Sequence, residues 1–526
     1  MSFDLTQYPY ASSRRVILGK NYAASTSQPL ATLAGMEMFW AGGNAVDAAL
    51  AMAIALTVVE PTSNGIGSDA FALVWDGQLH GLNASGKSPQ NLQLDNITQI
   101  PLVGWLTVTV PGAVSAWRSL WERWGKLPFE QLFAPAIRYA EQGFPVSPET
   151  ARAWQAASHF LSLNAPEFQA FKQVFFPSRR APRAGEIWGS LAHAKTLREI
   201  AATGGESFYR GDLAAKIADF AADTGGTLTK EDFTDHQPEW VQPISTNYRD
   251  LTVWEIPPNT QGIAALMALN ILEGFDLSRY PRDSVQSYHL QIEAMKLAFA
   301  DVRAHVGDLE HMKVTSDRLL DKTYAAQRRQ LIKEHAIFAK SDLPQGGTVY
   351  LATADRDLMV SFIQSNYMGF GSGILVPETG IALQNRGAGF TLQPGHPNQI
   401  APAKRPFHTI IPGFLTQNNR PLGPFGVMGG HMQPQGHLQV AVNLADYGMN
   451  PQAALDAPRW QFTTGKTVLL ESTVPSSVAL TLGDRGHDIH MIAERRNFGK
   501  GQIILKQGET LIAASEPRAD GIALAG

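Results

Sequence analysis

The residue best placed by sequence to act as a nucleophile is a threonine that follows two glycines. Thr348 comes directly after Gly346-Gly347 and opens a run of β-branched and aromatic residues, Val349 to Ala354, which predicts a strand. If the chain is cut after Gly347, Thr348 carries both a hydroxyl and a free α-amine. The amine can then accept the hydroxyl proton, so no separate histidine is needed. The alternative interpretation is an ordinary Gly-Gly loop that enters an edge strand.

Two strands joined by a tight turn are predicted to present this threonine. The second strand is Leu358 to Ile363, and Asp355-Arg356-Asp357 is the turn, so the pair is typical of a β-hairpin. Helices and buried strands alternate on both sides of residue 347, which favours a helix–sheet–sheet–helix core. Both halves must contribute to such a core. We therefore expect one folded domain built from residues 1–347 and 348–526.

Several segments resemble the γ-glutamyltranspeptidase family, most of them in its small subunit. They are Gly42 to Ala48 in the large part of the chain, and then Asn366 to Gly373, Gly380 to Asn385, Lys404-Arg405-Pro406 and Gly429-Gly430. The resemblance implies an α+β N-terminal nucleophile hydrolase, a four-layer αββα sandwich made by both products of self-cleavage between Gly347 and Thr348. It also implies a large subunit, 1–347, and a small subunit, 348–526, held together as a heterodimer, with pairing into a heterotetramer as a further expectation.

The resemblance assigns catalytic roles to four residues. Thr348 is the nucleophile, and its α-amine is the base. Gly429 and Gly430 match the pair whose backbone N–H groups stabilise the tetrahedral oxyanion, each donor being worth on the order of 3 kcal/mol. Asn366 matches the asparagine that follows the nucleophile hairpin and reaches into the pocket.

The chain departs from the family where a γ-glutamyl group is normally held. The arginine that binds its α-carboxylate is missing from Asn83 to Lys87, and Gly389 replaces the aspartate that binds its α-ammonium. The serine pair of the family becomes Phe407-His408-Thr409. A second threonine that supports the nucleophile is also absent, and Gln364 or Ser365 takes its place. A γ-glutamyl substrate therefore lacks its usual contacts.

Arg386 places a cation where the family has an acidic or neutral polar side chain. A buried charge is costly unless it is paired, so Arg386 should meet an anionic substrate or an internal acid. We expect a substrate with a carboxylate, no ammonium group and an amide close by, bound by Arg386 in a two-pronged contact. His408, Thr409 and Gln364 are expected to line the same pocket, with a structural role as the alternative for the first two.

A short dicarboxylic acid monoamide meets this description. Within the family, the sequence is most similar to the bacterial branch that contains oxamate amidohydrolase, which implies hydrolysis of oxamate to oxalate and ammonia. Three alternatives stay open. They are a cephalosporin-acylase-like enzyme acting on a glutaryl amide, a γ-glutamyl hydrolase or transferase, and an uncleaved binding or structural relative.

Composition argues against other classes of function. Of the 526 residues, 44% are hydrophobic and 17% are charged, as in an ordinary globular protein with a large core. A net charge of −4 provides no field for nucleic acid, and we expect no nucleic-acid partner. The absence of cysteine rules out disulfides, thiolate metal sites and a cysteine nucleophile.

No cofactor is implied, because the threonine and backbone donors suffice for the chemistry. His289 and Glu293 lie one helical turn apart, but no third metal ligand is apparent, so we interpret them as structural. The glycine loop Asn64 to Asp69 is followed by neither Lys-Ser/Thr nor a helix, so a phosphate loop is not favoured. Met1 to Arg15 lacks secretory features, and the apolar stretch Ala48 to Val59 is too short to span a bilayer. We expect a soluble cytoplasmic protein with no membrane partner.

Overall fold

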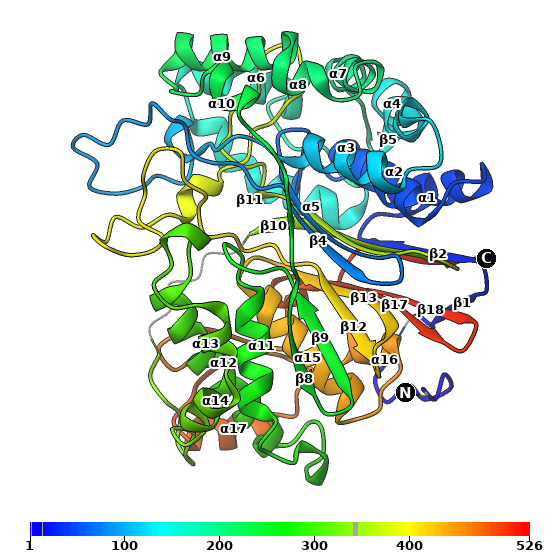
Figure 1. Cartoon of the computed structure of the whole chain (residues 1–526), viewed down its shortest axis with the longest axis vertical. Coiled ribbons are helices and arrows are strands. Elements are labelled where there is room, and N and C mark those ends of the chain that lie inside the picture. Colours follow the sequence, from blue (N-terminus) through cyan, green and yellow to red (C-terminus); the bar gives the residue numbers. More distant parts are fainter. Residues whose placement is uncertain (2, 13, 340–345) are drawn as a thin grey trace.

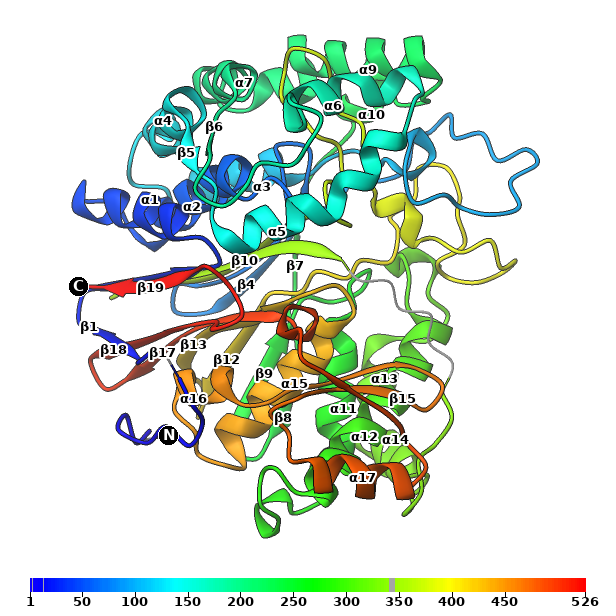
Figure 2. The same ribbon diagram turned by 180° about the vertical axis from the view of Figure 1, so that it is seen from behind.

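A computed structural model describes residues 1, 3–12, 14–339 and 346–526 (Figures 1 and 2). Two seven-stranded sheets lie face to face at its centre, and helices cover the outer face of each. This is the four-layer αββα arrangement predicted from the sequence, and it confirms the α+β class.

The first sheet contains the candidate nucleophile. Its strand order is β19-β2-β10-β11-β3-β4-β7. The strands are β2 (Tyr22–Thr26), β3 (Asp69–Trp75), β4 (Leu79–Asn83), β7 (Glu239–Val241), β10 (Gly347–Asp355), β11 (Met359–Tyr367) and β19 (Ile522–Ala525). Strands β10 and β11 form the predicted antiparallel hairpin, and β10 also pairs with β2. The hairpin therefore lies inside the sheet, which argues against the edge-strand interpretation.

The second sheet also combines strands from both sides of residue 347. Its order is β1-β18-β17-β13-β12-β9-β8. The strands are β1 (Ile17–Gly19), β8 (Ile244–Tyr248), β9 (Leu251–Glu255), β12 (Gly413–Gln417), β13 (Arg420–Met428), β17 (Lys500–Gln507) and β18 (Thr510–Ser515). Because neither part of the chain holds a complete sheet, each part needs the other to bury its apolar surface.

One helical layer packs on the hairpin sheet. The helices of this upper region in Figure 1 are α1 (Pro29–Trp40), α2 (Ala45–Val59), α3 (Ala113–Trp124), α4 (Ala134–Gln142), α5 (Pro148–Ala156), α6 (Gln169–Phe175), α7 (Leu191–Ala202), α8 (Glu206–Arg210), α9 (Asp212–Thr224) and α10 (Lys230–Thr234). Helix α2 is small and apolar throughout and is buried on every face. Asn44 caps it through a capping box with Asp47, as its position before the helix predicts.

The other helical layer covers the second sheet. It contains α11 (Gly262–Leu272), α12 (Val285–His305), α13 (Ser316–Leu320), α14 (Lys322–Arg329), α15 (Met432–Ala445), α16 (Pro451–Asp456) and α17 (Ser476–Asp484). Short strands complete the structure: β5 (Phe144–Pro145), β6 (Ile187–Trp188), β14 (Trp460–Thr464), β15 (Thr467–Glu471) and β16 (Asp488–Ile492). Within the described ranges, no helix is long and apolar enough to cross a bilayer.

Candidate active site

Thr348 lies at the start of β10, opposite an irregularity in β11. The register between the two strands shifts by one residue, so that Ser365 and Asn366 together face the single residue Thr348. A bulge of this kind increases the local twist and redirects side chains. Thr348 is only 3% exposed, and its Oγ1 lies 3.1 Å from Ser365 Oγ.

The Ser365 hydroxyl links this threonine to the peptide bond that precedes it. It donates to the carbonyl oxygen of Gly347 at 2.7 Å and accepts from the backbone N–H of Tyr367 at 2.8 Å. A donor on a carbonyl oxygen stabilises the negative charge that develops there during attack. Ser365 is therefore a candidate to stabilise the oxyanion if Thr348 Oγ1 attacks the carbonyl carbon of Gly347, an attack that would move the acyl group from nitrogen to oxygen before hydrolysis.

We expect Ser365→Ala to slow cleavage of the Gly347–Thr348 bond by about 100-fold, the usual effect of removing one oxyanion donor. Ser365→Thr keeps the hydroxyl and is the matched control, expected to be cut at close to the normal rate. A time course of full-length chain and products on a denaturing gel measures both. Equal cleavage rates for Ser365→Ala and the unmodified chain would contradict this role.

Arg386 is a buried cation whose hydrogen bonds and ring contact with other described side chains all involve neutral groups. Its side chain is 0% exposed and its guanidinium stacks 4.1 Å from the centroid of the Tyr367 ring. Nη1 donates to Thr409 Oγ1 at 2.8 Å, and Nη2 donates to Ser365 Oγ at 3.4 Å. In the described part of the chain, Nε has no hydrogen-bond partner and no carboxylate forms an ion pair with this guanidinium. Burial lowers the pKa of Arg386 to about 10, so the group remains charged at neutral pH.

Asp69 is an acid whose charge acts on Arg386, but its oxygens are already bonded. Oδ2 accepts from His408 Nε2 at 3.1 Å, and Oδ1 accepts from two backbone N–H groups. Burial raises the pKa of Asp69 to about 7, against the effect of Arg386. Burial also holds the pKa of His408 well below its usual value, and His408 Nδ1 accepts from the Ile410 N–H at 3.5 Å. Both ring nitrogens of His408 are thus hydrogen-bonded. His408 therefore has the structural role given as the alternative above, holding Asp69, and not the predicted role of lining the pocket.

Gln364, predicted to bind substrate, lies on the face of β11 opposite to Ser365, since side chains alternate along a strand. Its Oε1 accepts from the indole N–H of Trp117 at 2.9 Å, and its Nε2 donates to Asn64 Oδ1 at 2.7 Å. These bonds hold the amide away from Thr348. The second threonine of the family, which supports the nucleophile, is absent from this chain, and Gln364 and Ser365 are the two residues predicted to take its place. Ser365 lies beside Thr348, so we assign Ser365 and not Gln364 to the candidate site.

The side chain of Asn366 has one donor that no described residue accepts from. Its Oδ1 accepts from Ser68 Oγ at 2.7 Å, whereas its buried Nδ2 has no hydrogen-bond partner among the described residues. A buried donor without a partner costs about 1–3 kcal/mol, so such a group is expected to meet a ligand or water. Asn366 therefore remains a candidate for contact with substrate.

The glycine pair predicted to stabilise the oxyanion lies between β13 and α15. Gly429 and Gly430 have φ angles of 136° and 59°, in the region that favours glycine. A Cβ built on Gly346 would lie 3.6 Å from the backbone nitrogen of Gly430. Gly430 therefore lies close to Gly346, the residue before Gly347, and α15 begins two residues after Gly430, at Met432, with the positive end of its dipole toward the site.

A cleft of about 680 Å³ opens beside this group, lined by Tyr367, His431, Phe407 and the C-terminal half of α12. Gly389, at the position of the family's aspartate, also lines it. None of the described residues lining the cleft is acidic. The described lining of the cleft thus provides no carboxylate for a substrate ammonium group.

Comparison with known proteins agrees with this geometry. Residues 31–526 match the family described as Gamma-glutamyltranspeptidase. The chain belongs to the gamma-glutamyltranspeptidase family. Membership makes it an enzyme that acts on C–N bonds, and it confirms the predicted family.

Individual members of the family match almost the whole chain. The glutathione hydrolase-like YwrD proenzyme of Bacillus subtilis is 35% identical, covering 97% of this chain and 99% of the relative. The oxamate amidohydrolase proenzyme of Klebsiella pneumoniae is 33% identical, covering 94% and 96%. A solved cephalosporin acylase from Bacillus halodurans has a TM-score of 0.95 and 54% identity, covering 100% and 99%. The N-terminal nucleophile hydrolase fold is therefore confirmed.

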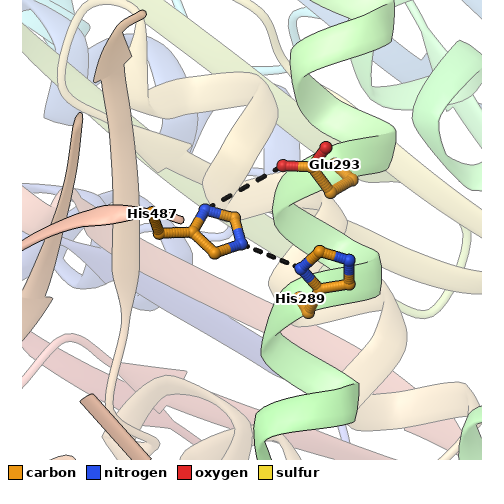
Figure 3. Close-up of side chains that lie close together, drawn as sticks. All are labelled: His289, Glu293 and His487. Atoms are coloured by element: carbon orange, nitrogen blue, oxygen red, sulfur yellow. Dashed lines mark hydrogen bonds and ion pairs between the residues drawn. The ribbon is translucent and has the colours of Figure 1, made fainter. Parts of the chain in front are cut away.

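This gamma-glutamyltranspeptidase-family chain also has a buried polar cluster away from Thr348. His289, Glu293 and His487 place potential metal-ligating atoms within 4.8 Å of one another (Figure 3). No pattern in the sequence points to His487, the third group. His289 Nε2 donates to the carbonyl of Lys333 at 2.7 Å, so its Nδ1 accepts from His487 Nε2 at 2.8 Å.

The remaining atoms of the cluster are also engaged. Lys296 Nζ donates to Glu293 Oε1 at 2.8 Å and lies 3.4 Å from His487 Nδ1. The Ile337 N–H donates to Glu293 Oε2 at 2.8 Å. The lone pairs a metal would need are thus occupied, and an ammonium group already neutralises the carboxylate. The cluster is a chain of hydrogen bonds that joins α12 and residues 333–337 to His487, which lies on the other side of the predicted cleavage site.

We expect Lys296→Met to lower the free energy of unfolding by about 3–5 kcal/mol, because it leaves the fully buried Glu293 without a counter-ion. The double variant with Glu293→Gln removes both charges and should recover part of the loss. Urea unfolding of the processed protein, followed by tryptophan fluorescence, measures the difference. A single variant as stable as the unmodified protein would show that Lys296 does not compensate Glu293.

Proposed function

We propose that this chain is the precursor of a self-cleaving amidohydrolase that uses Thr348 to hydrolyse a small amide bearing a carboxylate. The observation that carries the proposal is the buried charge of Arg386 near Thr348, which forms no ion pair with the residues that the structure describes. A substrate carboxylate would supply the missing partner in a desolvated site, where a charge-assisted, two-pronged contact is strong. Curated relatives that match along nearly the whole chain are named as proenzymes, which supports self-cleavage.

The proposed reaction has two steps. After cleavage, the α-amine of Thr348 takes the proton of Oγ1, and Oγ1 attacks the amide carbonyl of the substrate. The N–H groups of Gly429 and Gly430 stabilise the oxyanion. The C–N bond then breaks, the leaving nitrogen takes the proton from the ammonium group, and an ester on Oγ1 remains. Water attacks this ester, with the α-amine again as the base, and releases the acid and free Thr348.

The short distance between cation and nucleophile supports a short acyl group. Arg386 Nη2 lies 3.4 Å from Ser365 Oγ, which lies 3.1 Å from Thr348 Oγ1, so Nη2 and Oγ1 are at most 6.5 Å apart. In oxamate the carboxylate oxygens are about 2.4 Å from the amide carbon, whereas a glutaryl chain extends about 5 Å between its two carboxyl carbons. The attacking Thr348 Oγ1 must also lie about 3 Å from the amide carbon of the substrate. The remaining distance to Arg386 is short for a glutaryl chain. We therefore propose oxamate, split into oxalate and ammonia, as the first candidate.

A glutaryl amide with a bulky amine is the second candidate. The 54% identity to a cephalosporin acylase and the cleft of about 680 Å³ favour it, because ammonia needs no such volume. A γ-glutamyl substrate has less support, although glutathione hydrolase proenzymes are 30% identical, since the described lining offers no acid for its ammonium group.

A panel of matched amides tests the proposal. The processed enzyme is assayed with oxamate, with pyruvamide (which replaces the carboxylate by an acetyl group), and with the p-nitroanilides of glutaric acid and of γ-glutamate. We expect kcat/KM for oxamate to exceed that for pyruvamide by about 100-fold or more, the value of a charge pair in a desolvated site. Equal rates for oxamate and pyruvamide would contradict a role for the carboxylate.

We also propose that residues 1–347 and 348–526 remain together as a heterodimer after cleavage. Each central sheet takes strands from both parts, so separation would expose the apolar faces of both sheets. Pairing of two heterodimers remains a prediction.

A further inference from the structure

His431 directly follows the glycine pair and lines the open cleft. Its ring stacks on Phe407, with centroids 6.1 Å apart and an interplanar angle of 13°. Its Nδ1 lies 3.1 Å from Oε1 of Gln261, a fully buried residue just before α11. The second ring nitrogen, Nε2, has no hydrogen-bond partner among the residues that the structure describes.

The hydrogen bonds of Gln261 determine which nitrogen of His431 carries the proton. Gln261 Nε2 donates to the carbonyl oxygens of Thr409 at 2.5 Å and of Gly430 at 2.9 Å. Only the nitrogen of the amide can donate to two carbonyls, so its oxygen must face His431. An amide oxygen accepts hydrogen bonds only, and therefore Nδ1 of His431 bears the hydrogen and Nε2 bears a lone pair.

The surroundings keep this imidazole neutral. Burial, assisted by the positive charges of Arg386 and Arg303, lowers the pKa of His431 to about 3. At neutral pH the Nε2 lone pair is thus available as an acceptor. The Gln261 amide that fixes the tautomer of His431 also donates to the carbonyl of Gly430. It therefore fixes the position of the acceptor, His431 Nε2, relative to Gly430, the proposed oxyanion donor.

We propose that His431 Nε2 accepts a hydrogen bond from the N–H of the scissile amide, which makes His431 a specificity-determining residue for amides over esters, with Gln261 as its positioning residue. The inference rests on the proposed function. When the carboxylate of the acyl group is bound at the buried Arg386, the leaving nitrogen has the open cleft at His431 to enter. An ester presents an oxygen at this place, and two lone pairs then face each other without a hydrogen between them.

Two substitutions of His431 distinguish the acceptor at Nε2 from the other contacts of the imidazole ring. His431→Asn places an amide nitrogen near the position of Nδ1, where it still donates to Gln261, but it removes the acceptor at Nε2. His431→Gln extends an amide oxygen to the region of Nε2 and restores an acceptor. Each variant is assayed with N-ethyl oxamate and monoethyl oxalate, or with the matched glutaryl pair if the unmodified enzyme prefers it. Denaturing gels establish that each variant is cleaved.

We expect His431→Asn to lower kcat/KM for the amide about 10-fold, consistent with the loss of one hydrogen bond, and to change that for the ester less than about twofold. His431→Gln should restore part of the preference for the amide. Parallel losses for amide and ester in His431→Asn would overturn the assignment and leave the proposed function standing. An unmodified enzyme that hydrolyses none of the carboxylate-bearing amides would overturn the proposed function, and this assignment with it.

Discussion

Thr348→Ala is expected to leave the chain uncut and to abolish amide hydrolysis. The substitution removes the hydroxyl that we propose attacks the Gly347 carbonyl during maturation, and with it the proposed nucleophile for substrate. Loss of the nucleophile in hydrolases that act through an acyl-enzyme lowers kcat on the order of 10⁶-fold, and here the α-amine base is also never released. Denaturing gels and an ammonia-release assay measure the two effects together.

Thr348→Ser is the matched control, because it keeps the hydroxyl and loses only a methyl group. We expect this variant to be cut and to retain amidase activity. A Thr348→Ala protein that is cut after residue 347 and remains active would remove Thr348 from both reactions.

Arg386→Gln is expected to lower kcat/KM for a carboxylate-bearing amide by about 150- to 5,000-fold, since removing one partner of a buried charge pair costs about 3–5 kcal/mol. Cleavage of the precursor should continue, because Ser365 keeps its bonds to Gly347 and Tyr367. Steady-state kinetics with oxamate and pyruvamide isolates the effect of the charge. The substitution should lower kcat/KM for the anionic oxamate but change kcat/KM for the neutral pyruvamide little.

Arg386→Lys tests the shape of the contact. It keeps the charge but loses the planar fork, so we expect an intermediate kcat/KM. An Arg386→Gln enzyme with unchanged kcat/KM for the anionic amide would exclude carboxylate binding at this residue, and the substrate would have to be assigned from another part of the cleft.

Local pattern in the sequence predicts the frame of the site well. The glycine pair, the threonine and the run of β-branched and aromatic residues after it predict the hairpin, and the structure contains that hairpin. Asn44 before a run of small apolar residues predicts the start of α2, which it caps. These features depend on neighbours within a few residues, so the sequence carries them directly.

Long-range contacts are the part that the sequence does not reveal. The choice between Gln364 and Ser365 depends on a bulge that is visible only once β10 and β11 are paired. His408 bonds to Asp69, 339 residues away, and His289 bonds to His487, 198 residues away. The signal for Asp69 was an ionisable residue opening a buried strand after a glycine loop, which points to a bonded carboxylate but not to its partner.

An intact mass spectrum of the purified, denatured protein tests the self-cleaved threonine hydrolase most directly. We predict two chains, residues 1–347 and 348–526, the second beginning with Thr348. A single chain of 57.2 kDa from protein that hydrolyses amides would contradict a catalytic role for the α-amine of Thr348.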